Sequence, residues 1–319
     1  MRVRNVGAGG GAWAEVAARL KGRFLGSMIE GAMLSEYTTF RIGGPADLMV
    51  FPKGIGDLGR LLEAIAETGC PWMVMGNGSN LLFSDRGFRG VVVVLGRGFN
   101  RVKKNNKCEV YVESGCSINR FLSWAEEVEL GGLEDLAGIP GTMGGAARMN
   151  AGAMGTCIGD RVLELSVMGE SGGEVQHLAL DRDKAGFGYR RSGVKDREII
   201  YIVKLELYKK DRKEIRARKE HVLEWRRRHQ PLEYPSAGSV FKNPTGISAG
   251  ELIERCGLKG ARSGMAQISE KHANFIVNLG GASADDVLSL IRRVKEEVQG
   301  REGIELEEEI KIVGEVLEA

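Results

Sequence analysis

The chain has 319 residues, 43% of them hydrophobic and 28% charged, which is the balance of a globular protein with a large buried core. Its 45 Lys and Arg residues nearly match its 43 Asp and Glu residues, so the net charge of +2 argues against a protein whose main task is to bind a polyanion. The sequence has no apolar stretch of membrane-spanning length, no signal peptide and no CxxC pair among its five cysteines. We therefore expect a cytoplasmic protein without a metal centre, disulfides or a membrane partner.

Residues 1–27 form an N-terminal segment of uncertain role. Gly7–Ala12 fits a GxGxxA pattern and precedes the helical stretch Ala14–Leu20. A dinucleotide fingerprint requires a strand before the glycines and another after the helix, and neither is evident here. We therefore interpret this stretch as a glycine turn before a short helix.

Residues 28–100 are expected to form a small α/β subdomain. Its helix shows apolar residues at helical spacing, and its strands are short apolar runs. The predicted strands and helix are, in chain order, Ala46–Phe51, Ile55–Thr68 (the helix), Trp72–Met75 and Val91–Leu95.

Residues 101–210 are expected to form a second such unit. A helix at Ser117–Val128 has Ser117 as its candidate N-cap, and a glycine-rich stretch follows at Gly138–Ala146. The predicted strands are Glu109–Glu113, Val162–Gly169, Glu174–Leu180 and Ile199–Tyr208, with a hairpin turn at Ser171–Gly173.

Residues 211–319 are expected to form a third unit that begins with a linker helix. The stretch 209–230 is densely basic, but interleaved Asp and Glu residues favour a solvated linker helix over a nucleic-acid-binding surface. The elements predicted after it are a helix at Ala249–Cys256, a strand at Asn274–Asn278, a helix at Ala284–Val298 and a strand at Ile304–Val313.

Two glycine loops, one in each of the first two units, suit a ligand that lies between them. Gly76–Asn80 directly follows a strand, and its backbone NH groups can converge on an anion. Gly141–Gly145 leads into Ala146–Ala151, which we interpret as a helix start whose free NH groups a pyrophosphate could approach. The alternative is that the glycines only allow the two units to pack closely.

At these motifs the chain resembles the UDP-N-acetylenolpyruvoylglucosamine reductases, flavoproteins with an FAD domain of the vanillyl-alcohol-oxidase type. The matching segments run in family order over about residues 34–315 and are Thr38–Ala46, Gly76–Leu82, Gly138–Ala146, Met149–Ala153, Gly238–Pro244 and Glu309–Lys311. The resemblance implies an α+β fold, in which two α/β subdomains form the FAD-binding domain and a C-terminal α+β domain binds the substrate.

The resemblance also implies the reaction. NADPH would reduce FAD, and FAD would then reduce UDP-N-acetylglucosamine enolpyruvate to UDP-N-acetylmuramate in peptidoglycan precursor synthesis. None of the four histidines lies in or before the first glycine loop, so we expect noncovalent FAD in a monomeric protein. The implied cofactor-binding residues are Arg41, Gly76, Asn77, Gly78, Ser79, Asn80, Leu81, Gly138, Gly141, Gly144, Gly145, Ala146, Asn150 and Gly152.

Three residues match the catalytic positions of the family. Hydride addition to an enolpyruvyl group leaves negative charge on its carboxylate side and a carbon that must be protonated, so a fixed cation and a positioned acid are required. Arg190 matches the cation, Ser239 the proton donor and Glu309 the second stabilising residue. Arg191 stands where many members have an acidic residue. A surface arginine, a serine that satisfies local backbone and a solvated glutamate are the alternatives.

The resemblance also implies that five further residues contact the substrate: Tyr189, Arg226, Asn243, Lys259 and His272. The short interval between Arg190 and Ser239 is similar to that of a subgroup without an inserted loop whose tyrosine covers the substrate. An oxidase or dehydrogenase of the same FAD fold, acting on an alcohol or hydroxy acid, is the rival hypothesis. It gives no reason for the Gly238–Pro244 motif or for Glu309.

Overall fold

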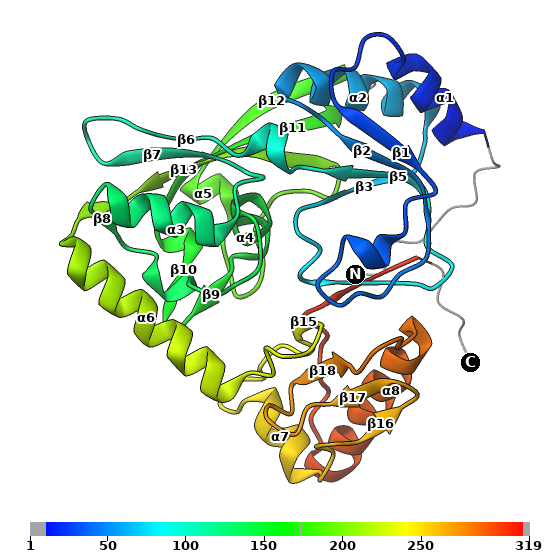
Figure 1. Ribbon diagram of the computed structural model, residues 1–319, viewed down its shortest axis with the longest axis vertical. Helices are drawn as coiled ribbons and strands as arrows, with labels where there is room; N and C mark the ends of the chain where they lie inside the picture. The colour runs from blue at the N-terminus through cyan, green and yellow to red at the C-terminus, as the bar shows by residue number, and fades with distance from the viewer. Residues whose placement is uncertain (1–10, 172–173, 315–319) are drawn as a thin grey trace.

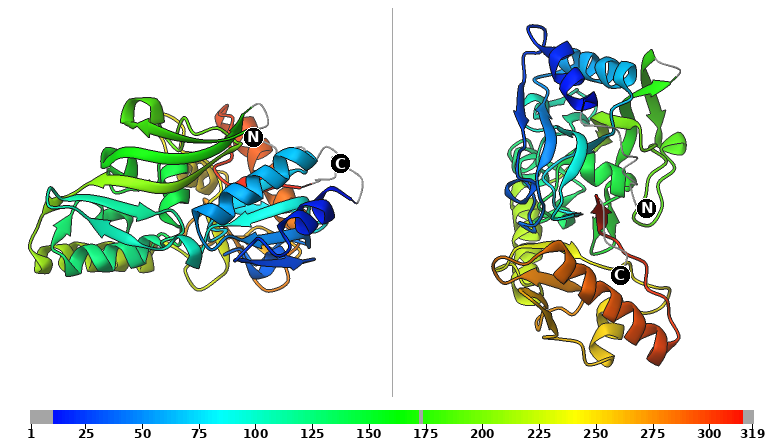
Figure 2. Two further views of the ribbon diagram at one scale, coloured as in Figure 1. Left: turned by 90° about the horizontal axis from the view of Figure 1, so that it is seen from above. Right: turned by 90° about the vertical axis from the view of Figure 1, so that its right-hand side faces the viewer.

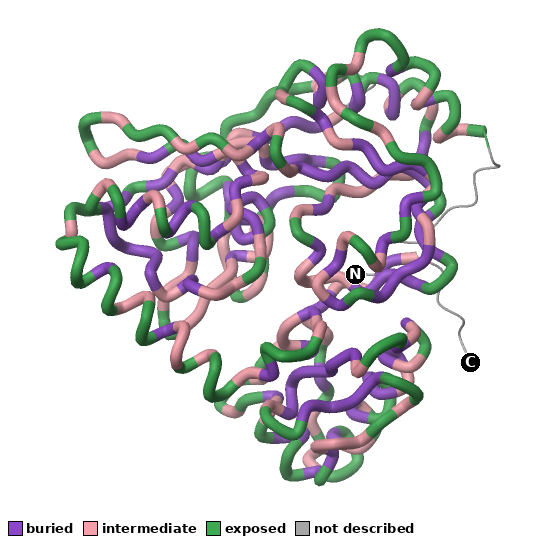
Figure 3. Tube along the Cα trace, viewed as in Figure 1, coloured by how far each residue is buried: buried purple, intermediate pink, exposed green. Residues whose placement is uncertain are grey.

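The computed structural model describes residues 11–171 and 174–314. The glycines at 7–10 and the hairpin glycines at 172–173 lie outside this range. The described chain folds into three parts, each with a hydrophobic core, and the third part lies below the first two in Figure 1 and in the right-hand view of Figure 2. Buried backbone runs along the central strands of each part (Figure 3).

The first part is built on the sheet β1-β2-β5-β3, in which β2, β5 and β3 are parallel and β1 is antiparallel. Helix α1 buries Val16 and Leu20 in the cluster that also holds Leu58 and Leu61 of α2, so the segment of uncertain role contributes to this core. The bounds are α1 Ala12–Leu20, β1 Ser27–Glu30, η1 Leu34–Glu36, β2 Ala46–Phe51, α2 Ile55–Thr68, β3 Trp72–Met75, β4 Leu81–Phe83, β5 Phe88–Val94 and η2 Arg97–Phe99.

The second part is built on the antiparallel sheet β12-β11-β13-β7-β6. Ser117 caps α3 as predicted, because its side chain accepts a hydrogen bond from Arg120 N. The bounds are β6 Val102–Lys104, β7 Glu109–Glu113, α3 Ile118–Glu127, β8 Leu130–Gly131, η3 Glu134–Leu136, α4 Met143–Met149, β9 Gly152–Ala153, β10 Thr156–Cys157, η4 Ile158–Asp160, β11 Val162–Ser171, β12 Glu174–Asp181, α5 Arg182–Ala185, β13 Glu198–Glu206 and β14 Tyr208–Lys209.

Helix α6 (Arg212–His229) leads from the second part to the third, as predicted for the basic stretch (Figure 1). Several of its cations pair with acids of the second part: Lys219 lies 2.9 Å and Arg216 2.7 Å from Glu126, and Arg218 lies 2.6 Å from Asp135. These ion pairs dock the N-terminal half of the helix on the second part, whereas Arg227 and Arg228 nearer its C-terminal end pair with Glu224 of the same helix.

The third part is the antiparallel sheet β15-β18-β17-β16 packed against two helices. Its core includes Phe40, Ile42 and Leu82 of the first part, so these two parts share one continuous cluster. The bounds are β15 Ser236–Ser239, α7 Ala249–Arg255, β16 Arg262–Ser263, β17 Ala266–Ile268, β18 Phe275–Asn278, α8 Ala284–Glu302 and β19 Lys311–Val313. Within the described residues, no helix is long and apolar enough to cross a membrane.

The final strand predicted at Ile304–Val313 is wrong in length and in placement. Only Lys311–Val313 forms a strand, and it pairs in parallel with β4 of the first part. Before it, Glu309 N donates to Val240 O over 2.7 Å, so the chain bridges the third and first parts here. The alternating sequence indicated an extended segment, but not which partner it would find.

Candidate active site

A cavity of ≈ 1750 Å³ lies where the three parts meet. It is larger than the roughly 300–1,000 Å³ of a typical small-molecule pocket, so it has room for a dinucleotide and a second ligand. Among the residues named from the sequence, it is lined by Arg41, Gly76, Asn77, Gly78, Ser79, Asn80, Leu81, Gly138, Gly141, Gly145, Ala146, Gly152, Arg190, Arg226, Ser239 and Glu309.

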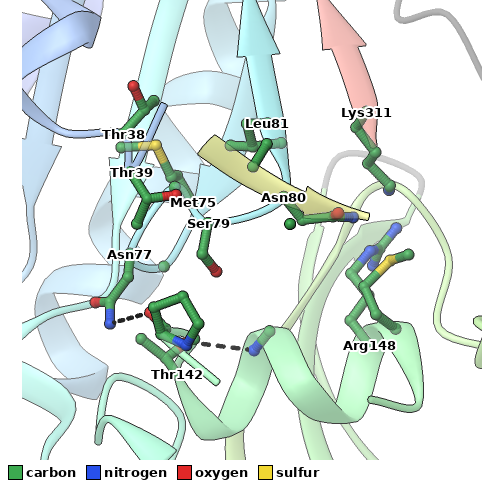
Figure 4. A pocket seen from close by; sticks show the side chains of 18 of the residues that line it. Thr38, Thr39, Met75, Asn77, Ser79, Asn80, Leu81, Thr142, Arg148 and Lys311 are labelled. Carbon is green, nitrogen blue, oxygen red and sulfur yellow. Dashed lines mark hydrogen bonds between the residues drawn. The ribbon is translucent and has the colours of Figure 1, made fainter. Parts of the chain in front are cut away.

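The first glycine loop follows β3 and lies beside the second loop at the cavity, with Asn77 close to Thr142 (Figure 4). Asn77 Nδ2 donates to Pro140 O over 2.9 Å, which ties the two loops together. Gly78 has φ +61°, and a Cβ there would lie 2.4 Å from Tyr37 O. Only glycine therefore permits this turn, which leaves the loop's backbone open toward the cavity.

The second loop enters α4, which begins at Met143, three residues before the predicted helix start. Thr142 is its N-cap, and its Oγ1 accepts a hydrogen bond from Gly145 N at 3.3 Å. A Cβ on Gly145 would meet only Thr142 Oγ1, at 3.4 Å, so a longer side chain there would extend toward the cavity.

We expect Gly145→Leu to lower the FAD content of the purified protein, because the new side chain would occupy ligand space without a serious clash in the protein. Gly59→Leu is the matched control, since a Cβ at this α2 position meets nothing within 4 Å and Gly59 does not line the cavity. Flavin absorbance per protein measures occupancy. Equal occupancy in the two variants would contradict the assignment of Gly145 to the cofactor site.

Gly144 and Asn150 do not line the cavity. A Cβ on Gly144 would lie 2.4 Å from Ser114 Cβ, so this glycine allows α4 to pack closely on its neighbour. Asn150 caps α4 with φ 44°, and its Nδ2 donates to Gly188 O over 2.9 Å. Asn150 therefore fixes the turn that carries Arg190.

Three cations that line the cavity have no carboxylate partner among the residues that the structure describes. Arg148 is paired with Asp196 at 2.8 Å, whereas Arg41, Arg226 and Lys311 have no such ion pair. Burial lowers the pKa of the Lys311 ammonium, and nearby Arg148 lowers it further. Unpaired cations beside open glycine loops fit the phosphates of anionic ligands, such as FAD or a nucleotide-linked substrate.

Arg190 and Glu309 meet in the cavity although they lie in different parts of the fold. Arg190 Nε is 2.7 Å from Glu309 Oε1, an ion pair in which the Nε–H is not aligned for a hydrogen bond. Nη1 of Arg190 donates to Gly152 O over 3.2 Å, and the backbone of Arg190 has φ +54°. Burial raises the pKa of the Glu309 carboxyl, and the charge of Arg190 opposes this shift.

Ser239 is brought to the same place by the backbone. It ends β15, and the carbonyl of the next residue, Val240, accepts the hydrogen bond from Glu309 N. The Asn80 side chain donates to Glu309 O over 3.1 Å, so the first glycine loop also contacts this segment. No hydrogen bond involves Ser239 Oγ within the described part of the chain. Its hydroxyl is therefore not occupied with local backbone, the alternative weighed from the sequence.

Four of the predicted substrate residues lie outside the cavity lining: Tyr189, Asn243, Lys259 and His272. The Tyr189 hydroxyl accepts from Asn243 N at 3.2 Å, Lys259 pairs with Glu254 at 2.7 Å, and His272 Nδ1 accepts from Asn274 N at 3.3 Å. Their substrate contacts stay predictions. Arg226 does line the cavity, and its Nε donates to Ala137 O over 2.8 Å.

Sequence reasoning missed Lys311 and Trp225, which both line the cavity. Lys311 lies two residues after Glu309, and residues two apart in an extended segment share one face, so this spacing was a usable signal. Trp225 carried no motif, and only the docking of α6 brings it to the cavity. None of the four histidines lines the cavity.

These features define a flavoprotein with a dinucleotide cavity between its first two parts and a third part that reaches the same cavity. Family models match accordingly: an FAD binding domain over residues 46–179 and the UDP-N-acetylenolpyruvoylglucosamine reductase C-terminal domain over 230–313. The chain belongs to the UDP-N-acetylenolpyruvoylglucosamine reductase family.

Named relatives support this assignment over nearly the whole chain. The reductase of Heliobacterium modesticaldum is 43% identical over 293 residues, 91% of this chain and 92% of that protein. The reductase of Geobacter metallireducens is 43% identical, covering 94% and 99% of the two chains. The crystal structure of the reductase from Thermus caldophilus matches with a TM-score of 0.75 at 37% identity, covering 91% and 99%.

Proposed function

We propose that this protein is an NADPH-dependent flavoenzyme that reduces UDP-N-acetylglucosamine enolpyruvate to UDP-N-acetylmuramate. The observation that carries the proposal is the meeting of Arg190, Glu309 and the unoccupied hydroxyl of Ser239 in one cavity beside two glycine loops. This reaction belongs to peptidoglycan precursor synthesis. We therefore propose that the protein acts in the cytoplasm and contributes to cell shape and cell division. We further propose a monomer that binds neither nucleic acid nor membrane.

Bound FAD supplies a hydride carrier between NADPH and the substrate double bond. The residues that hold it noncovalently are those of the loops 76–81 and 138–142, with Gly145, Ala146, Gly152, Arg41 and the cavity-facing ammonium of Lys311. The glycines admit the ligand to the backbone NH groups, and the unpaired cations balance its phosphate charge.

Arg190 and Glu309 act on the substrate carboxylate side. The guanidinium provides the fixed positive charge that a developing enolate requires, in a half-buried site where such a charge is more effective than in water. Glu309 holds the Arg190 side chain through their 2.7 Å ion pair. Asn150 holds the Gly188–Arg191 turn through its hydrogen bond to Gly188 O, so the cation is preorganised before substrate binds.

Ser239 is the proposed proton donor. It is half-buried at the end of β15, and a hydroxyl without another partner can be directed at the substrate carbon. A hydroxyl is a weak acid in water, but it can protonate a strongly basic carbon when the geometry is fixed.

An anaerobic titration tests the function. The flavin absorbance should bleach on addition of NADPH and return on addition of the enolpyruvyl substrate, with UDP-N-acetylmuramate as product. A flavin that is instead reduced by simple alcohols or hydroxy acids, and is not reoxidised by the enolpyruvyl substrate, would favour the rival oxidase or dehydrogenase. The chain's similarity to the C-terminal reductase domain over residues 230–313 argues against that rival.

A further inference from the structure

Four large apolar side chains line the cavity and are nevertheless exposed: Met154 at 38%, Trp225 at 39%, Leu232 at 55% and Tyr234 at 45%. We refer to the two aromatic residues together with Leu232, that is Trp225, Leu232 and Tyr234, as the aromatic rim. Trp225 lies near the C-terminal end of α6, and the other two lie in the connection to β15. Exposed apolar surface that is gathered at a cavity mouth is typical of a ligand contact, whereas scattered exposed residues need no explanation.

The rim is held in place. The Trp225 ring stacks on His229 at 4.5 Å between ring centroids and 16° between planes. His229 Nδ1 lies 2.8 Å from Trp225 O. The connection is fixed at its end, because Asn278 N donates to Pro235 O over 2.9 Å. A flat ring anchored on one side is suited to stack a second flat ring.

Arg226 adds a cation beside the rim. It has no carboxylate partner among the described residues, and burial lowers the pKa of its guanidinium. Gly138 allows this placement, since a Cβ there would lie 2.9 Å from Arg226 Cδ. An aromatic surface next to an unpaired arginine offers one contact for a base and one for a phosphate, the two groups of a nucleotide.

The rim also lies at a suitable chain distance from the reactive end of the site. Tyr234 is five residues from Ser239, a stretch that spans at most about 18 Å when extended. A hexose and a diphosphate can bridge such a distance. A ligand with its enolpyruvyl group at Ser239 can therefore place its nucleoside at the rim.

We propose that the aromatic rim binds the uracil ring of the UDP-linked substrate, with Trp225 as the stacking surface and Arg226 on the diphosphate. This inference rests on the proposed function. It also identifies what covers the nucleotide end of the substrate in a chain that has no inserted loop between Arg190 and Ser239.

Calorimetric titration of the FAD-loaded protein with UDP tests the inference. Trp225→Ala should weaken UDP binding by about tenfold or more, the size of a lost base–aromatic stack, with FAD content unchanged. Trp225→Phe keeps an aromatic plane and should restore most of the affinity. UDP should quench the tryptophan fluorescence of the Trp124→Phe variant, which keeps Trp225, but should quench that of the Trp225→Phe variant much less. Trp124 is a suitable control position, because its ring stacks on Phe121 and does not line the cavity.

Unchanged UDP affinity in Trp225→Ala would overturn the inference. Loss of FAD from this variant, or a loss of NADP⁺ affinity with UDP binding intact, would also overturn it, because the ring would then contact a different nucleotide. The two hypotheses fail separately: the wild-type protein's reaction with the enolpyruvyl substrate tests the function, whereas UDP affinity tests the rim.

Discussion

Ser239→Ala should leave flavin reduction by NADPH nearly unchanged and slow flavin reoxidation by the enolpyruvyl substrate by roughly 10²–10⁴, the usual effect of losing a positioned acid. The substitution removes one oxygen that has no hydrogen-bond partner within the described residues, so the surrounding backbone should keep its geometry. Arg190 and Glu309 remain, and substrate binding should therefore suffer much less than the chemical step.

Stopped-flow absorbance of the two half-reactions measures this separation. Ser236→Ala is a suitable control, because Ser236 also lies on β15 and lines the cavity but has no proposed role in proton transfer. If reoxidation stays fast in Ser239→Ala while reduction slows, Ser239 is not the proton donor. If both variants slow reoxidation equally, the effect belongs to the strand and not to the hydroxyl.

Arg190→Gln should slow reoxidation by about 10²–10³, a loss comparable to that of one preorganised donor at a developing oxyanion. The charge of Arg190 is the main influence that opposes the burial-driven rise in the pKa of Glu309. Removing it should raise that pKa further. A higher pH is then needed to ionise Glu309. If the reoxidation rate depends on the ionised form, the acidic limb of the pH–rate profile should therefore move to higher pH.

Reoxidation rates across pH measure both effects. Arg191→Gln is the matched control, since Arg191 is exposed, carries the same charge and does not line the cavity. We expect this variant to keep both the rate and the position of the acidic limb. A normal rate in Arg190→Gln would remove the arginine from the mechanism. A slow rate without a shift of the acidic limb would show that the charge of Arg190 does not control the ionisation of Glu309 during the reaction.

Many elements could be predicted because their signals are local. The helix at Ile55–Thr68 and the strands at Ala46–Phe51, Trp72–Met75 and Glu109–Glu113 have the predicted bounds. Each is specified by apolar periodicity over a few turns or residues, with glycine, proline or polar residues at its ends. The cap at Ser117 is equally local, because its partner is three residues away.

The partners of short segments could not be predicted. β19 has three residues and pairs with β4, more than two hundred residues earlier in the chain. A three-residue strand has no period long enough to identify, and the sequence carries no record of which edge it meets. The same limit hid the shared core, in which Phe40 and Ile42 of the first part pack within the third.

The sequence by itself determined the family and located the glycine loops, and it predicted Arg190, Ser239 and Glu309 as catalytic residues, since residue type and order within motifs are local properties. Only the tertiary structure decided that Arg190 and Glu309 form an ion pair, that Gly144 and Asn150 support the site from outside the cavity, and that Lys311 and Trp225 line it. The physical reason is that cavity position and charge pairing depend on contacts between segments distant in the chain. Such contacts are selected by packing across the whole fold and not by the neighbours of each residue.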